Sequence, residues 1–154
     1  MDKQILTLQG KVKPAGNYKN IIFHIGLYLI AGVLLISGIS KIADPLPFIE
    51  TVKAFTGLSE EIIILAATIL PVLEIGLGIL LILKIKLKPA LLVTLILFGG
   101  FLAFSIYGTI MGMNNDCGCF GSLVKSQIGW GMVGRNILFT IIVALIHLRV
   151  KKNY

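Results

Sequence analysis

The residues with the clearest chemical potential are Cys117 and Cys119, which only Gly118 separates. A disulfide between them closes a very small ring, and a glycine between the two sulfurs relaxes the backbone enough to allow it. Departure from relaxed geometry stores strain, and strained, exposed disulfides are the more oxidising and labile ones. Such a short loop adds little entropic stabilisation. The pattern therefore favours a cysteine pair that passes a disulfide on over one that staples a fold.

The elements that position these cysteines must be membrane helices, because the composition excludes a soluble domain. The chain has 154 residues, of which 56% are hydrophobic and 14% are charged, and its mean hydropathy is +0.96. A soluble domain of this size exposes about half of its residues to water and cannot hide so much apolar surface. An ordinary soluble enzyme, a disordered tail and a disulfide-rich secreted module are thereby excluded.

Four segments are long and apolar enough to cross a bilayer as helices. They are predicted at 21–39, 62–83, 89–107 and 128–148, joined by loops 40–61 and 108–127 on one side. A basic segment, 1–20, and a tail, 149–154, lie on the other side. The sequence thus predicts an all-α, polytopic membrane protein with a bundle of four transmembrane helices.

The first loop is expected to hold a short amphipathic helix. Phe48, Val52 and Phe55 recur at about helical spacing, and Pro45 and Pro47 stand at the entry, where a missing N–H costs little. The connection between the second and third spans is so short that these spans must be antiparallel neighbours.

The distribution of basic residues sets the orientation. Ten of them flank the predicted spans on the side of the two termini: Lys3, Lys11, Lys13, Lys19, Lys84, Lys86, Lys88, Arg149, Lys151 and Lys152. The other side has only Lys41, Lys53 and Lys125, together with several acidic residues. The positive-inside rule then predicts both termini in the cytoplasm and the cysteine loop outside, at the periplasmic face of a bacterial inner membrane. The net charge of +7 is explained by topology and anionic lipid, so we expect a lipid bilayer and no nucleic acid as partner.

Two other uses of the cysteines stay open. Two thiolates are half of a site for copper(I) or zinc, but His24 and His147 are both predicted near the cytoplasmic ends, so a metal site would need a partner chain. Inert packing thiols would be expected inside a span rather than in a polar loop. Because an oxidising compartment sustains disulfides, we predict a redox role for the pair and no metal site in this chain alone.

Ionisable residues inside the spans are the next candidates, because each costs several kcal/mol unless it is paired or hydrated. Glu74 lies near the middle of the second span, and Arg135, followed by Asn136, lies about two turns into the fourth. One expectation is a buried Glu74–Arg135 pair. The alternative places Arg135 under the cysteine loop with Trp130 and Phe120, where it helps to bind an anionic or quinone-like group. Ser40 and Lys41, at the outer end of the first span, are candidates for the same pocket.

With these elements placed, the chain resembles the MauE branch of the DoxX-like membrane proteins. Its most specific matching stretch is Asp116-Cys117-Gly118-Cys119-Phe120-Gly121. Softer matches are Ser37 to Ile42 with Asp44, Pro45 and Phe48, then Pro71 to Glu74 with Gly76 and Gly78, and Gly134-Arg135-Asn136. Together they cover the chain from about Ile21 to Leu148.

The resemblance implies a four-helix membrane protein associated with thiol chemistry in the cell envelope. MauE is linked to maturation of the disulfide-rich small subunit of methylamine dehydrogenase, and DoxX relatives to membrane oxidoreductase complexes. The chain also looks like the bundle of DsbB and vitamin K epoxide reductase, which couple thiols to quinones. Those proteins use two cysteine pairs and this chain has one, so a thioredoxin-like or other cysteine-containing partner would complete a relay. Quinone is the cofactor that this likeness suggests, and the residues by themselves specify none.

Two hypotheses of function follow. In the first, Cys117 and Cys119 exchange disulfides with an extracytoplasmic protein, assisting the maturation of envelope proteins, while Arg135 and Lys41 favour the thiolate or position the partner. In the second, the chain is a non-enzymatic subunit or assembly factor of a larger envelope complex, and the cysteine pair is structural or binds metal. Either is compatible with an oligomer.

Overall fold

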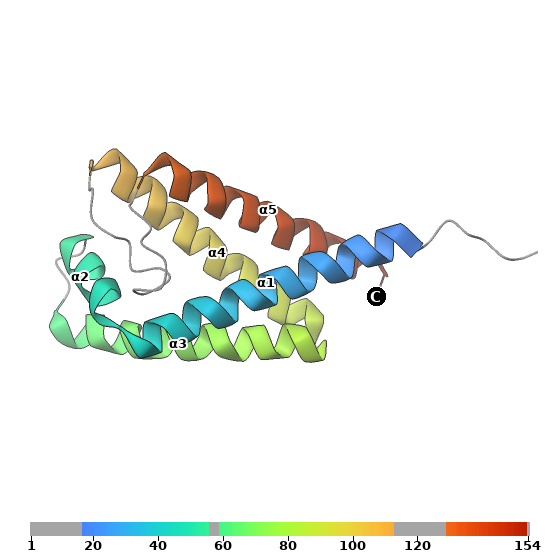
Figure 1. Cartoon of the computed structure of the whole chain (residues 1–154), viewed down its shortest axis with the longest axis horizontal. Helices are drawn as coiled ribbons and strands as arrows, with labels where there is room; N and C mark the ends of the chain where they lie inside the picture. The colour runs from blue at the N-terminus through green and yellow to red at the C-terminus, as the bar shows by residue number, and fades with distance from the viewer. Residues whose placement is uncertain (1–16, 56–58, 113–128, 154) are drawn as a thin grey trace, which may run out of the picture.

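The computed structural model describes residues 17–55, 59–112 and 129–153, and every element within them is an α-helix. The helices are α1 (Asn17–Ala43), α2 (Leu46–Phe55), α3 (Glu60–Leu83), α4 (Leu87–Ile110) and α5 (Trp130–Asn153). All except α2 contain a stretch long and apolar enough to cross a membrane. The predicted all-α bundle of four membrane-spanning helices is confirmed (Figure 1).

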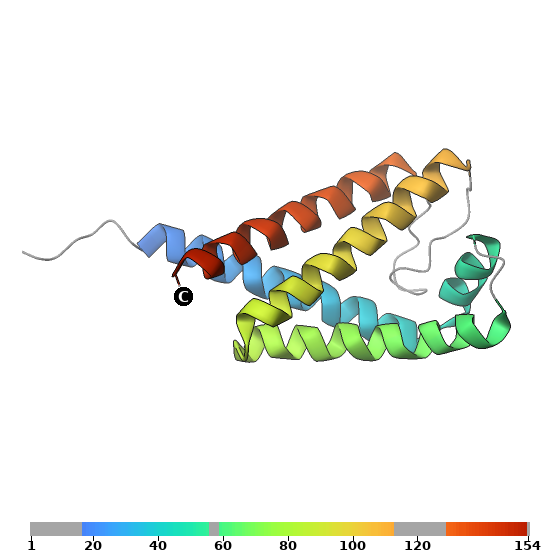
Figure 2. The same cartoon turned by 180° about the vertical axis from the view of Figure 1, so that it is seen from behind.

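The bundle has two ends, which we call the α2 end and the hairpin end (Figures 1 and 2). At the α2 end, α1 and α4 finish, α2 lies across the bundle, and α3 and α5 begin. At the hairpin end, a tight turn joins α3 to α4 and α5 finishes. The cysteine-bearing segment between α4 and α5 therefore starts and finishes at the α2 end.

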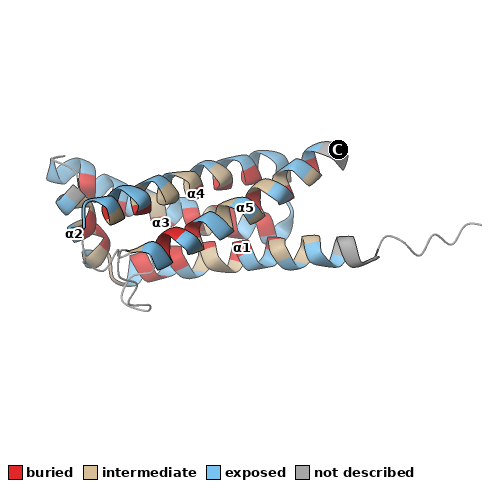
Figure 3. Cartoon of the chain, turned by 90° about the horizontal axis from the view of Figure 1, so that it is seen from above, coloured by how far each residue is buried: buried red, intermediate tan, exposed pale blue. Residues whose placement is uncertain are grey.

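The four long helices pack as two pairs. Contacts are most extensive between α1 and α3 and between α4 and α5, and the two pairs meet through smaller contacts of α1 with α5 and of α3 with α4. The apolar core joins all four helices and includes Leu27, Leu34, Leu81, Phe98 and Val143. Buried residues face the interior while the outer surfaces are largely exposed (Figure 3), and many large apolar side chains lie on those surfaces. An apolar exterior of this extent suits lipid rather than water.

Two glycines allow α1 and α3 to approach each other closely. A Cβ atom on Gly38 would lie 2.8 Å from the carbonyl oxygen of Pro71, and one on Gly78 would lie 2.9 Å from Cγ of Leu35. Small residues at such contacts let helix backbones pack tightly in membranes, where the lipid supplies no hydrophobic driving force. This tight α1–α3 seam positions the buried polar residues described below.

The short amphipathic helix expected in the first loop is confirmed as α2. Its inner face buries Phe48 and Thr51, while Leu46 is 63% exposed. The hydroxyl of Thr51 donates to the carbonyl oxygen of Pro47 at 2.7 Å, which satisfies the polar group inside the helix. Helix α2 packs on α3, and the ring of Phe48 comes close to α1 through Lys41.

The turn at the hairpin end is built from lysines in an unusual backbone conformation. Lys84 and Lys86 have φ angles of 56° and 47°, in the left-handed region. The amide of Ile85 donates to the carbonyl oxygen of Leu80 at 3.1 Å and so closes the last turn of α3. Glycine is the usual residue at such positions because it has no Cβ. The turn makes α3 and α4 antiparallel neighbours, as their short connection predicts.

Candidate functional site

The most deeply buried charges in the described part of the chain form one ion pair between α1 and α3. The Nζ atom of Lys41 lies 2.9 Å from Oε1 and 3.0 Å from Oε2 of Glu74. The side chain of Lys41 is 1% exposed and that of Glu74 is 0% exposed. Lys41 also donates to the hydroxyl of Ser37, one turn earlier on α1. Both carboxylate oxygens are thus engaged, as burial of a charge in an apolar setting requires.

The pair lies near the middle of the predicted hydrocarbon layer. Glu74 is ten residues from Lys84 at the hairpin end and fourteen from Glu60 at the α2 end. At 1.5 Å per residue these spacings are about 15 Å and 21 Å, so Glu74 falls near the centre of a core about 30 Å thick. Lys41 was expected in the loop 40–61, but α1 continues through Ala43 and carries Lys41 into the bundle. A charged residue at this depth is costly and is retained for pairing or for function.

The expected pairing of Glu74 with Arg135 is wrong. Lys41 occupies the carboxylate, because α3 packs along α1 rather than along α5. Arg135 lies half-buried on α5, five residues after Trp130, and Trp130 is 78% exposed at the start of that helix. Arg135 therefore belongs to the α2 end of the bundle.

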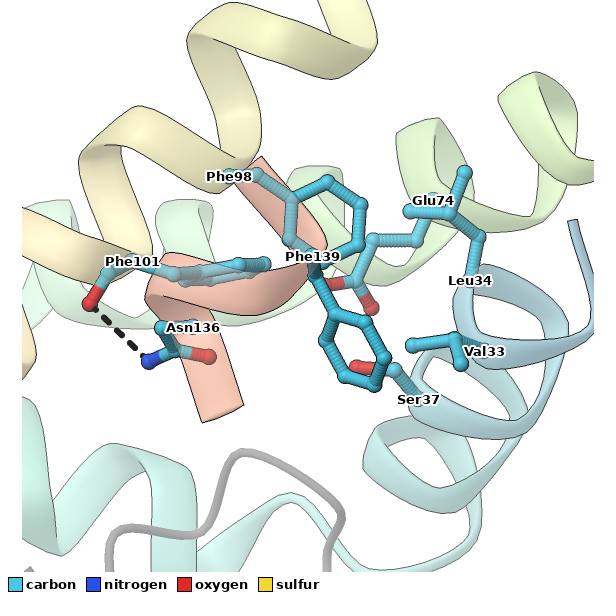
Figure 4. Close-up of a pocket in the computed structure, with 8 residues that line it drawn as sticks. All are labelled: Val33, Leu34, Ser37, Glu74, Phe98, Phe101, Asn136 and Phe139. Carbon is cyan, nitrogen blue, oxygen red and sulfur yellow. Dashed lines mark hydrogen bonds between the residues drawn. The ribbon is translucent and has the colours of Figure 1, made fainter. Parts of the chain in front are cut away.

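A small cavity lies beside the ion pair and brings in one more of the predicted site residues, Asn136 (Figure 4). It leaves about 20 Å³ in which the centre of a water molecule fits. Its polar lining comes from Ser37 on α1, Glu74 on α3 and Asn136 on α5. The remaining lining residues are apolar: Val33, Leu34, Phe98, Phe101 and Phe139. A space of this size with several polar partners is large enough for one water molecule.

The amide of Asn136 also ties α5 to α4. Its Nδ2 atom donates to the carbonyl oxygen of Phe101 at 3.4 Å, and the residue is 6% exposed. The dashed line in Figure 4 marks this bond. Asn136 thus connects the α4–α5 pair to the cavity that Glu74, the acid of the ion pair, also lines.

Aromatic rings separate Lys41 from the outside of the bundle. Its Nζ lies 5.2 Å from the ring centroid of Phe101 and 5.9 Å from that of Phe48. Both rings also line an apolar cleft of about 420 Å³ between α2, α3 and α4, together with Val52, Leu70, Ile96, Leu97, Gly100 and Phe104. Cation–π contact adds to the stabilisation of the buried ammonium group. Lys41 is consequently enclosed by Glu74, Ser37 and two rings rather than presented at the surface.

A comparison with models of known protein families covers most of the chain. The family model described as methylamine utilisation protein MauE matches residues 19–149. The chain belongs to the MauE family. The match runs from the start of α1 almost to the end of α5, so it includes the ion pair, Asn136, Arg135 and the cysteine segment. Neither the curated proteins nor the solved structures contain a match to this chain.

In this MauE family member, the cysteine motif lies outside the described residues. Asp116, Cys117, Gly118, Cys119, Phe120 and Gly121 all fall within 113–128, so their predicted roles stay predictions. The residues that bracket the segment are described: Gly112 follows α4 with a φ of 68°, and Gly129 precedes α5. Within the described ranges no group of three or more His, Cys, Asp or Glu residues is placed to hold a metal ion.

Sequence reasoning missed how Ser37, Lys41 and Glu74 combine in this MauE protein. The spacing of Ser37 and Lys41, four residues apart, places both on one face of a helix. The single acid within the second predicted span also needed a nearby cation. Those two signals together would have identified the pair, had the first span been extended past Ile39.

Proposed function

We propose that this MauE family protein exchanges disulfides with an extracytoplasmic partner protein through Cys117 and Cys119, and thereby assists the maturation of envelope proteins. The supporting observation is that the only two cysteines of the chain, one residue apart, lie in the segment that joins α4 to α5 at the α2 end. By the positive-inside rule that end faces outward from a bacterial cytoplasmic membrane. An oxidising compartment there would sustain the disulfide.

The exchange proceeds in two balanced steps. The thiolate of one cysteine attacks a disulfide of the partner, forming a mixed disulfide and releasing one partner thiolate. The second cysteine, deprotonated in turn, attacks the sulfur of the first, closing the Cys117–Cys119 disulfide and releasing the second partner thiolate. Two electrons pass to the partner, and the two protons lost by the pair are taken up by the partner's thiolates. The reverse sequence oxidises a partner dithiol at the expense of the Cys117–Cys119 disulfide.

Arg135 is the cation that we assign to the cysteine pair. Lys41 is 1% exposed and engaged by Glu74 and Ser37, so its charge is already compensated. Arg135 is half-buried on the first turns of α5, close in sequence to the cysteine segment. A nearby guanidinium stabilises a thiolate. Trp130, with 78% exposure, together with Phe120, Gly121 and Asp116, would form the surface that meets the partner protein.

The first test traps the mixed disulfide. Of the variants Cys117→Ser and Cys119→Ser, one should accumulate a covalent adduct with an envelope protein, because the resolving cysteine is absent. The other, lacking the attacking cysteine, should form none. Non-reducing electrophoresis of membranes quenched with acid reports the adduct, and the double variant is the matched control. Retention of full function by that double variant would contradict the exchange and favour a subunit or assembly factor of an envelope complex.

Arg135 offers a second test of the same site. Arg135→Gln should slow alkylation of the reduced cysteines at pH 7 by about fivefold, the effect of losing about 1 kcal/mol of charge stabilisation near a surface. Arg135→Lys should retain most of the rate. The rate of iodoacetamide labelling as a function of pH measures this. Lys53→Gln, which removes an exposed cation on α2, is the control and should leave the rate unchanged. Equal rates in the Gln variant and the wild type would remove Arg135 from the site.

A further inference from the structure

A second cavity of interest lies at the hairpin end, opposite the α2 end. The α3–α4 turn and the end of α5 line an open cavity of about 430 Å³. Three lysines line it, together with three apolar residues: Lys84, Lys86, Lys88, Leu87, Pro89 and Val150. The three lysines are exposed, whereas Val150 is 4% exposed and closes the inner side. The cavity thus combines a cationic mouth with an apolar wall.

Among the described residues, nothing at this end neutralises the lysines. The described acids are Asp44, Glu50, Glu60, Glu61 and Glu74, which lie at the α2 end or at mid-depth. The first turn of α4 contains no acidic residue. A concentration of positive charge without a protein counter-charge favours an anionic ligand.

Two lysines of the turn have a backbone conformation that favours glycine. Lys84 and Lys86 have φ angles of 56° and 47°, a conformation that costs a residue with a Cβ about 1 kcal/mol and glycine almost nothing. The ammonium group of Lys84 lies 5.7 Å from the ring centroid of Tyr28 on α1. Two residues that would be more stable as glycine are lysines, so their side chains have a use at this place.

We propose that this cavity binds the phosphate headgroup of an anionic phospholipid. The lysines contact the phosphate, and the apolar wall of Leu87, Pro89 and Val150 contacts the adjoining glycerol and acyl chains. Apolar side chains in and beside the turn continue the apolar path, since Leu83, at the end of α3, is 60% exposed and Ile85, in the turn, is 47% exposed. A soluble anion needs only the lysines, whereas an amphipathic anion uses both the lysines and the apolar wall. Basic cavities between membrane helices are suited to such headgroups.

The test measures how lipids raise the melting temperature of the full-length protein in dodecylmaltoside. Short-chain phosphatidylglycerol should bind about tenfold or more tightly than short-chain phosphatidylcholine, because each lysine near a membrane surface contributes about 1 kcal/mol, or about fivefold. The double variant Lys84→Gly/Lys86→Gly should lose most of this preference. Its melting temperature without lipid should be equal to or above that of the wild type, because glycine suits both φ angles.

The control variant, Lys53→Gln/Lys151→Gln, removes two charges outside the cavity and should keep the preference for phosphatidylglycerol. Equal binding of the two lipids by the wild type would overturn the proposal, as would an undiminished preference in the double glycine variant. An equal loss in the control variant would show that net charge, rather than the cavity, attracts the lipid. Stabilisation by millimolar inorganic phosphate as large as that by phosphatidylglycerol would identify a soluble anion as the ligand instead.

Discussion

Replacing Lys41 alone with methionine is expected to lower the free energy of unfolding by about 3–5 kcal/mol, the usual result of breaking a buried ion pair. The loss arises because Glu74, which is 0% exposed, would keep a carboxylate with no cation near the centre of the membrane. Glu74→Gln should cost a similar amount, since it leaves the ammonium group of Lys41 without its acidic partner. Unfolding in mixtures of dodecyl sulfate and dodecylmaltoside, followed by circular dichroism, measures both variants.

The double variant Lys41→Met/Glu74→Leu separates charge from packing. It removes both charges and fills most of their volume, so its stability should return to within about 1 kcal/mol of the wild type or exceed it. The exposed pair of Lys53 and Glu60, with side chains 45% and 77% exposed and N and O atoms 2.6 Å apart, is the matched control. Lys53→Met should not measurably change the free energy of unfolding, because water screens that pair. A double variant as unstable as either single variant would mean that packing of the site, and not its charges, determines the loss.

If the double variant is stable, its activity decides why the pair is present. An apolar substitution that restores stability but abolishes disulfide exchange would show that the buried charges serve function. The cavity that Glu74 shares with Ser37 and Asn136 gives a physical route, because it links the α1–α3 seam to α5, the helix that carries Arg135. Undiminished exchange would instead leave the pair with a role in specifying how α1 and α3 pack.

The helices were predictable from sequence, and the pairing of the charges was not. Runs of about twenty apolar residues mark the four spans, and the spacing of Phe48 and Val52 marks α2, because both patterns are local properties of the chain. The partner of Glu74 depends on which helix packs against α3, and that is set by close contacts such as those of Gly38 with Pro71. Such contacts join residues more than thirty positions apart and leave no periodic signal.

The position of Lys41 illustrates the same limit. A charged residue after an apolar run is ordinarily taken as the end of a span, so Lys41 was expected in a loop. In the structure its charge is compensated internally by Glu74 and Ser37, and α1 continues past it. Hydropathy treats each residue as if it faced lipid or water alone, and therefore misses a charge that the protein itself neutralises. The relation of Arg135 to the cysteines stays a prediction, because the cysteines lie outside the described residues.

Among glycine-to-alanine substitutions in the α1–α3 seam, Gly38→Ala is expected to lower the free energy of unfolding the most. The new Cβ would lie 2.7 Å from Cγ1 of Ile75 and 2.8 Å from the carbonyl oxygen of Pro71. The backbone oxygen cannot move by a rotamer change, so α1 and α3 must separate, at a cost of about 1–3 kcal/mol. Gly32→Ala, on the same helix, is the matched control because its Cβ would meet nothing within 4 Å. The stability of that variant should equal that of the wild type or exceed it by up to about 1 kcal/mol, since alanine has a higher helix propensity than glycine.

The same substitution tests whether the close approach exists to hold the ion pair. Gly38 is three residues before Lys41 and therefore on the same face of α1, and its Cβ would also come within 3.3 Å of Cβ of Glu74. If separating the helices stretches the pair, Gly38→Ala should cost less in the Lys41→Met/Glu74→Leu background than in the wild type. A thermodynamic cycle of the four proteins, unfolded in the same detergent mixtures, gives this coupling. Equal costs in both backgrounds would show that the glycine serves packing alone, and that the charges tolerate the added distance.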